Sequence, residues 1–182
     1  MTLALPGFEE EAVKGGDITY TPDDIAAAIV RRFRPQGRIL DPCRGGGAFT
    51  RAMPTADWCE VRDGRDFFAW REPVDWIVSN PPYSTFAPFL RHSFTVAREI
   101  VYLVSLCKLF YSDRLMRDVW AWGGVKTVMV IGNGKALGWP FGYCFGALHF
   151  SKDYRGPMGV EFHTPNMVLC VKTHSKDEKT EI

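Results

Sequence analysis

The sequence lacks the residue patterns of metal-binding and disulfide-bonded proteins. It contains no Cys-x-x-Cys pair, and its four histidines are dispersed, so we expect no metal site. The five cysteines are an odd, scattered set, which indicates reduced thiols in a cytosol rather than a disulfide framework. No Gly-Lys-Ser or Gly-Lys-Thr follows the glycine-rich stretch, and this excludes a P-loop for nucleoside triphosphates.

Long apolar runs and a strong net charge are also absent. No stretch is long enough to span a bilayer, and residues 1–7 lack the basic and apolar regions of a signal peptide. We therefore expect a cytoplasmic protein that does not act at a membrane. The net charge is +1, so charge alone does not indicate a nucleic-acid partner, although a basic face can be balanced by acids elsewhere.

The length of 182 residues suits one compact domain. We expect a flexible lead-in over 1–16, a single domain over 17–172 and a polar tail over 173–182. Apolar periodicity and capping signals predict helices over 21–33, 48–53, 86–98 and 113–122. Apolar runs predict strands over 38–40, 57–61, 74–78, 100–106, 125–131, 145–150 and 167–171. This alternation predicts an α/β fold with a mostly parallel sheet, covered on both faces, and an antiparallel edge.

A glycine loop, Asp41-Pro42-Cys43-Arg44-Gly45-Gly46-Gly47, directly follows the first predicted strand. Glycines at this place let the backbone approach a ligand closely, and Glu60 ends the next strand where an acid can reach ribose hydroxyls. A dinucleotide site would need a third glycine at position 50, which is Thr. Asp41 would also repel a pyrophosphate but attract the cationic amino acid part of S-adenosylmethionine. A tight strand-to-helix turn without a ligand is the alternative reading.

The second loop, Ser79-Asn80-Pro81-Pro82-Tyr83, follows the third predicted strand. An exocyclic amine on a nucleobase is a poor nucleophile, because its lone pair is delocalised into the ring. The carbonyl groups of Asn80 and Pro81 could both accept its N–H bonds and aim the lone pair at a sulfonium methyl group. Tyr83 would then stack on a flipped base, with Phe86 as a neighbouring wall. A rigid turn made by the two prolines is the alternative.

Four motifs occur in the order seen in N6-adenine DNA methyltransferases. They are Tyr20-Thr21-Pro22, Asp41-Pro42-x-x-Gly45-x-Gly47, Gly64-Arg65-Asp66-Phe67 and Ser79-Asn80-Pro81-Pro82-Tyr83. The chain resembles that family, and within it the small phage- and prophage-type enzymes. The resemblance implies a single-domain class I, Rossmann-like methyltransferase fold with a seven-stranded sheet, and S-adenosylmethionine as cofactor.

The resemblance also implies roles for the motif residues. Asp41 and Glu60 would bind the methionine and ribose parts of the cofactor, and Asp66 and Phe67 its adenine. The other cofactor-binding residues would be Tyr20, Thr21, Pro22, Pro42, Cys43, Gly45, Gly47 and Asn80. The catalytic loop would be Asn80, Pro81, Pro82 and Tyr83. No separate target-recognition domain is expected after Tyr83, so sequence specificity would be low, would be built from short loops, or would be supplied by a partner protein or a second copy.

Two further stretches have more than one interpretation. Trp139 and Phe141 lie in a glycine- and aromatic-rich loop that could contact a base, or could pack as an apolar hairpin on the sheet edge. Pro42-Cys43 matches the nucleophile dipeptide of cytosine-C5 methylases, but it lies in the glycine loop, where Cys43 is expected to be a small lining residue.

The leading hypothesis is methylation of the N6 amine of adenine in DNA. The same loop occurs in methylases of RNA base amines and of protein glutamine side chains, which are the second hypothesis. The third is an inactive cofactor-binding subunit that regulates an active partner.

Overall fold

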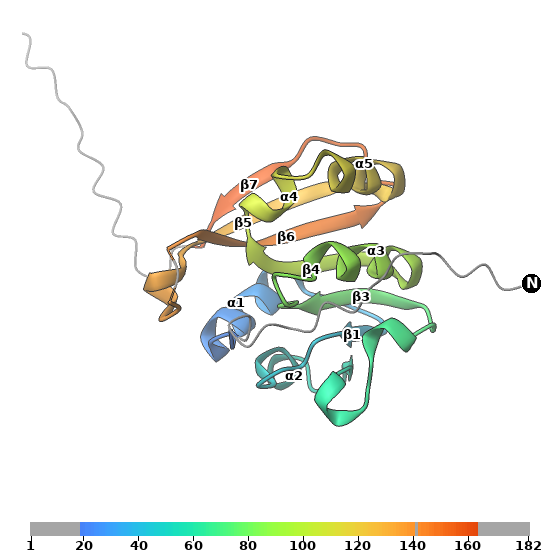
Figure 1. Cartoon of the computed structure of the whole chain (residues 1–182), viewed down its shortest axis with the longest axis vertical. Helices are drawn as coiled ribbons and strands as arrows, with labels where there is room; N and C mark the ends of the chain where they lie inside the picture. Colours follow the sequence, from blue (N-terminus) through green and yellow to red (C-terminus); the bar gives the residue numbers. More distant parts are fainter. Residues whose placement is uncertain (1–18, 141, 164–182) are drawn as a thin grey trace, which may run out of the picture.

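The computed structural model describes residues 19–140 and 142–163. Seven described strands form one sheet in the order β2-β1-β3-β4-β6-β5-β7 (Figure 1). Their bounds are β1 Ile39–Asp41, β2 Asp57–Trp58, β3 Val74–Ser79, β4 Ala97–Ser105, β5 Gly123–Asn133, β6 Cys144–Lys152 and β7 Gly159–Phe162. Strand β6 runs antiparallel to β4 and β5, and the other neighbouring pairs are parallel. The predicted α/β fold with a mostly parallel sheet is confirmed.

Five helices and three short 3-10 turns connect the described strands. The helices are α1 Asp23–Phe33, α2 Ala48–Ala52, α3 Phe86–Val96, α4 Cys107–Phe110 and α5 Asp113–Trp122. The 3-10 turns are η1 Val61–Asp63, η2 Phe67–Ala69 and η3 Gly134–Leu137. Helix α1 starts directly after Pro22 with Asp23 and Asp24 in its first turn, where acids complement the helix dipole.

Several predicted boundaries are wrong. Helix α3 ends at Val96 instead of 98, because Ala97 already pairs with Val74 of β3 and the sheet overrides local helix propensity. Strand β2 has two residues instead of five, since Glu60 caps the turn η1. Strand β5 begins at Gly123 instead of 125, and a Cβ on Gly123 would lie 2.1 Å from the carbonyl oxygen of Ser151.

The predicted antiparallel hairpin is β5–β6, but the edge strand beside it is β7, which the sequence did not indicate. The predicted strand over 167–171, the lead-in 1–16 and the tail 173–182 lie outside the described residues.

The two faces of the sheet each carry a hydrophobic core. Along β4, the side chains of Ile100, Tyr102 and Val104 join one core, and those of Val101 and Leu103 join the other. This alternation follows the two-residue period of a strand. Helices α3, α4 and α5 contribute to the first core and lie together over one face of the sheet (Figure 1). Helices α1 and α2 contribute to the second core.

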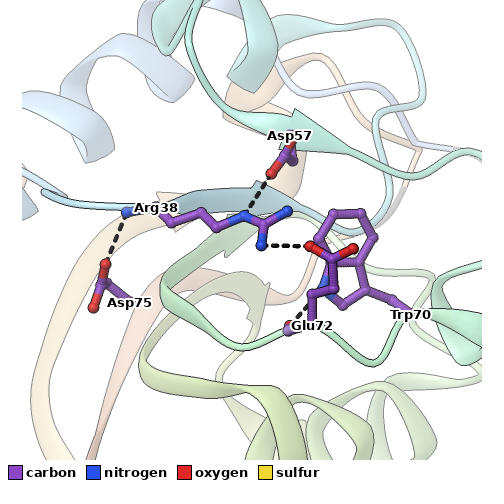
Figure 2. A network of polar contacts seen from close by, with 5 residues as sticks. All are labelled: Arg38, Asp57, Trp70, Glu72 and Asp75. Atoms are coloured by element: carbon purple, nitrogen blue, oxygen red, sulfur yellow. Dashed lines mark hydrogen bonds and ion pairs between the residues drawn. The ribbon is translucent and has the colours of Figure 1, made fainter.

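A polar network fastens the amino ends of β1, β2 and β3 (Figure 2). The Arg38 guanidinium donates to Asp57 and pairs with Glu72, while its backbone N–H donates to Asp75. The indole of Trp70 lies 5.3 Å from the Arg38 guanidinium carbon and donates to the Glu72 carbonyl. Parallel strands present ligand-binding loops at their carboxyl ends, so this network lies at the end of the sheet away from both predicted loops. We interpret it as structural.

None of the described helices is both long and apolar enough to cross a membrane.

Candidate active site

A cavity of about 400 Å³ lies where β1 and β3 end. Its walls come from four places in the sequence: the segment before α1, the glycine loop with α2, the residues after β2, and the loop after β3. The lining residues are Thr19, Tyr20, Thr21, Cys43, Arg44, Gly45, Gly46, Ala48, Phe49, Arg51, Glu60, Val61, Arg62, Asn80, Pro81, Pro82 and Tyr83. The structure therefore brings together three of the four motifs that the sequence singled out.

The glycine loop has the backbone that its residues favour. Gly45 and Gly47 adopt φ values of 50° and 81°, in the left-handed region where a Cβ is unfavourable. The Gly45 N–H donates to Oε2 of Glu60 (2.9 Å), which ties the loop to the end of β2. The Tyr20 ring packs so closely on the loop that a Cβ at Gly46 would lie 3.0 Å from Tyr20 Cδ1. The loop thus offers an open main-chain surface between Glu60 and Tyr20.

Asp41 is fully buried beneath this loop. Its Oδ1 accepts from the Ser79 hydroxyl (2.6 Å) and from the Cys43 N–H (3.3 Å). Its Oδ2 is buried and accepts no hydrogen bond from the described residues. Burial raises the pKa of this carboxyl to about 7, although the Ser79 and Cys43 hydrogen bonds act in the opposite direction. Asp41 is not among the residues that line the cavity.

Asn80 has a fixed orientation at the end of β3. Its Nδ2 donates to the Thr19 carbonyl (3.1 Å) and to the Thr21 hydroxyl (3.0 Å). Its Oδ1 is buried and accepts no hydrogen bond from the described residues. A buried acceptor without a donor is uncommon in a folded protein, and one beside a cavity is suited to a donor from a bound molecule.

Pro81 is buried and Tyr83 is half-buried, and both contribute to the cavity wall with Pro82. The Tyr83 ring centroid lies 5.4 Å from that of Phe145 on β6, so the sheet core supports this ring. Phe86 is only 2% exposed and packs against Tyr102, with the two ring centroids 6.3 Å apart. It is a core residue of α3 and does not line the cavity, which corrects the expectation that it forms a substrate wall.

Trp139 has a different place from the one expected for a base-stacking residue. It is 7% exposed, and its ring meets Phe145 edge-on at 4.6 Å. Its Nε1–H donates to the Tyr20 carbonyl (3.1 Å), so it contacts the segment that covers the cavity rather than the cavity itself. Phe141 lies outside the described residues.

Asp66 and Phe67, expected beside the cofactor adenine, are not among the lining residues. The Asp66 carboxylate caps η2 by accepting from the Phe68 N–H (2.9 Å). Phe67 is 2% exposed and packs against Phe89 and His92. Pro22 and Pro42 also lie outside the lining; Pro22 precedes α1 and Pro42 follows the buried Asp41.

The three arginines of the cavity wall, Arg44, Arg51 and Arg62, were not predicted as site residues. Arg51 is held by Asp23 (2.5 Å) and by the Gly46 carbonyl (2.7 Å), and so braces the loop against α1. A hydrogen bond with the Tyr20 side chain raises the pKa of Arg62. Arg51 lies one helical turn after Gly47, and Arg62 lies two residues after Glu60. These positions are the sequence signals that could have indicated the two arginines.

The Cys43 thiol lines the cavity as a neutral group. Burial, followed by the charge of Asp41, raises its pKa to about 12. A thiol nucleophile needs a lowered pKa, so this environment disfavours the cytosine-C5 type of chemistry and suits a small lining residue. Among the described residues no group of three or more His, Cys, Asp or Glu side chains could hold a metal ion.

Comparison with protein-family models and with curated protein sequences found no match. Solved structures do match. A protein from Listeria monocytogenes described as a class I S-adenosylmethionine-dependent methyltransferase aligns with a TM-score of 0.57 and 15% identity, over 84% of this chain and 67% of that one. A modification subunit of a type I restriction enzyme from Vibrio vulnificus gives 0.57 and 14%, over 79% of this chain and 46% of the subunit.

A third similar structure is described as an RNA methyltransferase from Pyrococcus horikoshii, with a TM-score of 0.53 and 14% identity over 71% of this chain and 82% of that one. This chain therefore spans less than half the length of the Vibrio subunit and most of the length of the Pyrococcus protein. The likenesses establish the architecture: the chain has the Rossmann-like fold of class I S-adenosylmethionine-dependent methyltransferases.

Proposed function

We propose that this chain is an S-adenosylmethionine-dependent methyltransferase that modifies the exocyclic N6 amine of adenine in DNA. The observation that carries the proposal is the orientation of Asn80. Its amide hydrogens are both directed at the Thr19–Thr21 segment, and its carbonyl oxygen is left as a buried acceptor at a cavity beside the glycine loop.

The cavity residues suit this cofactor. Glu60 lines the cavity two residues after β2, near the position from which a carboxylate accepts from ribose hydroxyls. The exposed main chain of Gly45 and Gly46 lets a flat, uncharged part of a ligand approach closely. The guanidinium groups of Arg44 and Arg62 complement a carboxylate such as that of the methionine part. The cofactor supplies an electrophilic methyl group on a sulfonium centre.

The chain's own contribution is to position the acceptor amine. Asn80 Oδ1 and the Pro81 carbonyl accept its two N–H bonds, which favours a pyramidal nitrogen whose lone pair faces the methyl carbon. Held at Glu60 and the Gly45–Gly46 main chain, the cofactor would supply the methyl group to this nitrogen and leave as a thioether, and the nitrogen would lose one proton to solvent. Tyr83 stacks on the base, which has been flipped out of the duplex.

Target recognition is proposed to come from a partner protein or a second copy. The modification subunit from Vibrio belongs to a multisubunit type of restriction enzyme, and this chain spans 46% of its length. Methylation of a base amine in RNA remains the second candidate, supported by the fold likeness to the Pyrococcus protein.

Transfer of a labelled methyl group to unmodified DNA, RNA and protein, followed by base-resolved product analysis, tests the proposal. We expect N6-methyladenine in DNA. Asn80→Ala should lower kcat by roughly 10²- to 10³-fold, the usual effect of removing one preorganised polar group. Tyr83→Ala should lower activity more than Tyr83→Phe, which keeps the ring.

Two results would contradict the proposal. An Asn80→Ala variant that methylates DNA at the wild-type rate would exclude the mechanism. A product confined to RNA or to protein glutamine would keep the mechanism but replace the substrate.

A further inference from the structure

The Asn80 carboxamide is held by a segment that is distant in the sequence. Thr19 and Thr21 lie 61 and 59 residues before Asn80, and both accept from its Nδ2. The Thr19 acceptor is a main-chain carbonyl, which has no hydrogen to donate. A carboxamide rotated by 180° would place its own oxygen against that carbonyl, so only the observed orientation is favourable. The position of the Thr19–Thr21 main chain thereby decides where Asn80 Oδ1 points.

That segment is itself fixed from the other side of the molecule. Trp139, which lies 119 residues after Tyr20, donates its Nε1–H to the Tyr20 carbonyl (3.1 Å). The residue is 7% exposed, and its ring packs on Phe145, which also contacts Tyr83. The indole is therefore anchored in the core between the turn η3 and β6, and can serve as a rigid donor. At its carboxyl end the segment continues into α1, where the Pro22 carbonyl accepts from the Ala26 N–H.

We propose that Trp139 is a positioning residue. It fixes the Tyr20 peptide and, through the Thr19 carbonyl and the Thr21 hydroxyl, orients the carboxamide of Asn80. This inference rests on the proposed function only where it gives Asn80 a role in methyl transfer; the positioning itself is a property of the folded chain. It replaces the expectation that Trp139 stacks on a nucleobase.

The test uses the Trp139→Phe variant of the full chain, which keeps an aromatic ring against Phe145 but removes the donor. The first measurement is the solvent-exchange rate of the Asn80 side-chain amide hydrogens by NMR, with the signals assigned from their loss in Asn80→Ala. The second is kcat for methyl transfer, with the dissociation constant of S-adenosylmethionine measured separately. We expect exchange to accelerate and kcat to fall, each by roughly threefold to tenfold, the effect of losing one hydrogen bond, with little change in cofactor affinity.

Trp122→Phe is the matched control. Trp122 also donates its Nε1–H to a main-chain carbonyl, that of Phe94 (3.0 Å), but it lies at the end of α5 and does not line the cavity. This variant loses the same kind of hydrogen bond, and we expect it to change neither the Asn80 exchange rate nor kcat. If both variants lowered kcat equally, the effect of Trp139→Phe would be general destabilisation, and the inference would be overturned.

A second pair of variants tests the other end of the connection, and it does not depend on Trp139→Phe folding. Thr21→Val keeps the shape of the side chain but removes the acceptor for Asn80, so exchange should accelerate and kcat should fall as above. Thr21→Ser keeps the hydroxyl and should restore most of what Thr21→Val loses. Equal behaviour of the two variants would overturn the orienting role of the hydroxyl.

The NMR measurement separates this inference from the proposed function. Faster Asn80 exchange in Trp139→Phe, with no methyl transfer to any acceptor by the wild-type chain, would support the positioning and contradict the proposed function. Unchanged exchange would overturn the positioning whatever the activity. Faster exchange with an unchanged kcat would overturn its role in catalysis.

Discussion

At the scale of single residues, the carboxyl group of Asp41 titrates far from its usual range in water. It is fully buried, its Oδ2 accepts from none of the described residues, and burial raises its pKa to about 7. An unfolded chain loses this proton near pH 4, whereas the folded chain keeps it until about pH 7. Between these values unfolding releases a proton, so raising the pH favours unfolding. Asp41 therefore lowers the stability of the fold progressively across this window, and by a constant amount above it.

The Asp41→Asn variant tests this linkage, because it keeps an acceptor for Ser79 and has no proton to lose. We expect the stability of the variant relative to wild type to increase from pH 5 to 7, by at most about 1.4 kcal/mol per pH unit, and to level off above pH 7. Urea unfolding at pH 5, 6, 7 and 8 measures this difference. Ser93→Ala is the control. It deletes a buried hydroxyl that contacts Tyr102, and it should change the free energy of unfolding by the same amount at every pH. Parallel curves for Asp41→Asn and wild type would contradict the raised pKa.

At the scale of secondary-structure elements, the described helices differ in how their first turns are stabilised. The hydroxyl of Ser112 accepts from the Leu115 N–H (3.2 Å) at the start of α5, whereas the residues before α1 and α3 make no such side-chain bond. An N-cap hydroxyl contributes about 1 kcal/mol to the stability of a helix. Helix α5 also places Leu115 and Val119 in the core on the face of the sheet opposite α1 and α2.

Ser112→Ala should therefore lower the free energy of unfolding by about 1 kcal/mol and leave methyl transfer unchanged, because Ser112 is not among the residues that line the cavity. Ser112→Asp retains an acceptor at the cap and should lose much less. Denaturant unfolding and kcat, measured on both variants, check the two parts. A large loss of activity in Ser112→Ala would show that α5 is coupled to the active site.

Some of the elements and side-chain directions could be predicted from the sequence, and others could not. Helix α1 could be predicted from Pro22 followed by two acids, and strands β1 and β3 from short apolar runs. The loops after β1 and β3 meet because the carboxyl ends of neighbouring parallel strands share one edge of the sheet. Strand β7 was missed because it has only four residues, and its two apolar side chains, Val160 and Phe162, are exposed at the edge of the sheet and form no apolar run. The directions of Phe86 and Trp139 were missed because they depend on tertiary packing against Tyr102 and Phe145, which the residues around them do not specify. Asn80 was identified from its motif, but not the Thr19 and Thr21 acceptors that orient it.

At the scale of the whole molecule, charge limits how strongly the chain can hold DNA alone. The net charge is +1, and of the three arginines in the cavity wall Arg51 is already engaged with Asp23 and Gly46. Arg44 also pairs with Asp63 and Arg62 also hydrogen-bonds with Tyr20, and both are proposed to face the carboxylate of the cofactor, so in the proposed complex at most these two groups of the cavity wall would contact phosphate groups close to a flipped base. Each neutralised phosphate contributes about −0.9 to the slope of log K against log salt concentration, so two contacts give a slope of about −2.

We therefore expect the isolated chain to bind duplex DNA weakly, with a Kd in the nonspecific range of about 10⁻⁴ to 10⁻⁶ M at physiological salt. Arg62→Ala should reduce the magnitude of the salt slope by about 0.9, with little dependence on the DNA sequence. Fluorescence anisotropy with a labelled duplex at several salt concentrations measures both quantities. A slope as steep as about −6 would require a basic surface beyond the cavity wall and would remove the need for the proposed partner. A shallow slope, together with methylation that strengthens when a second protein is added, is the result expected if catalysis and target recognition reside in different chains.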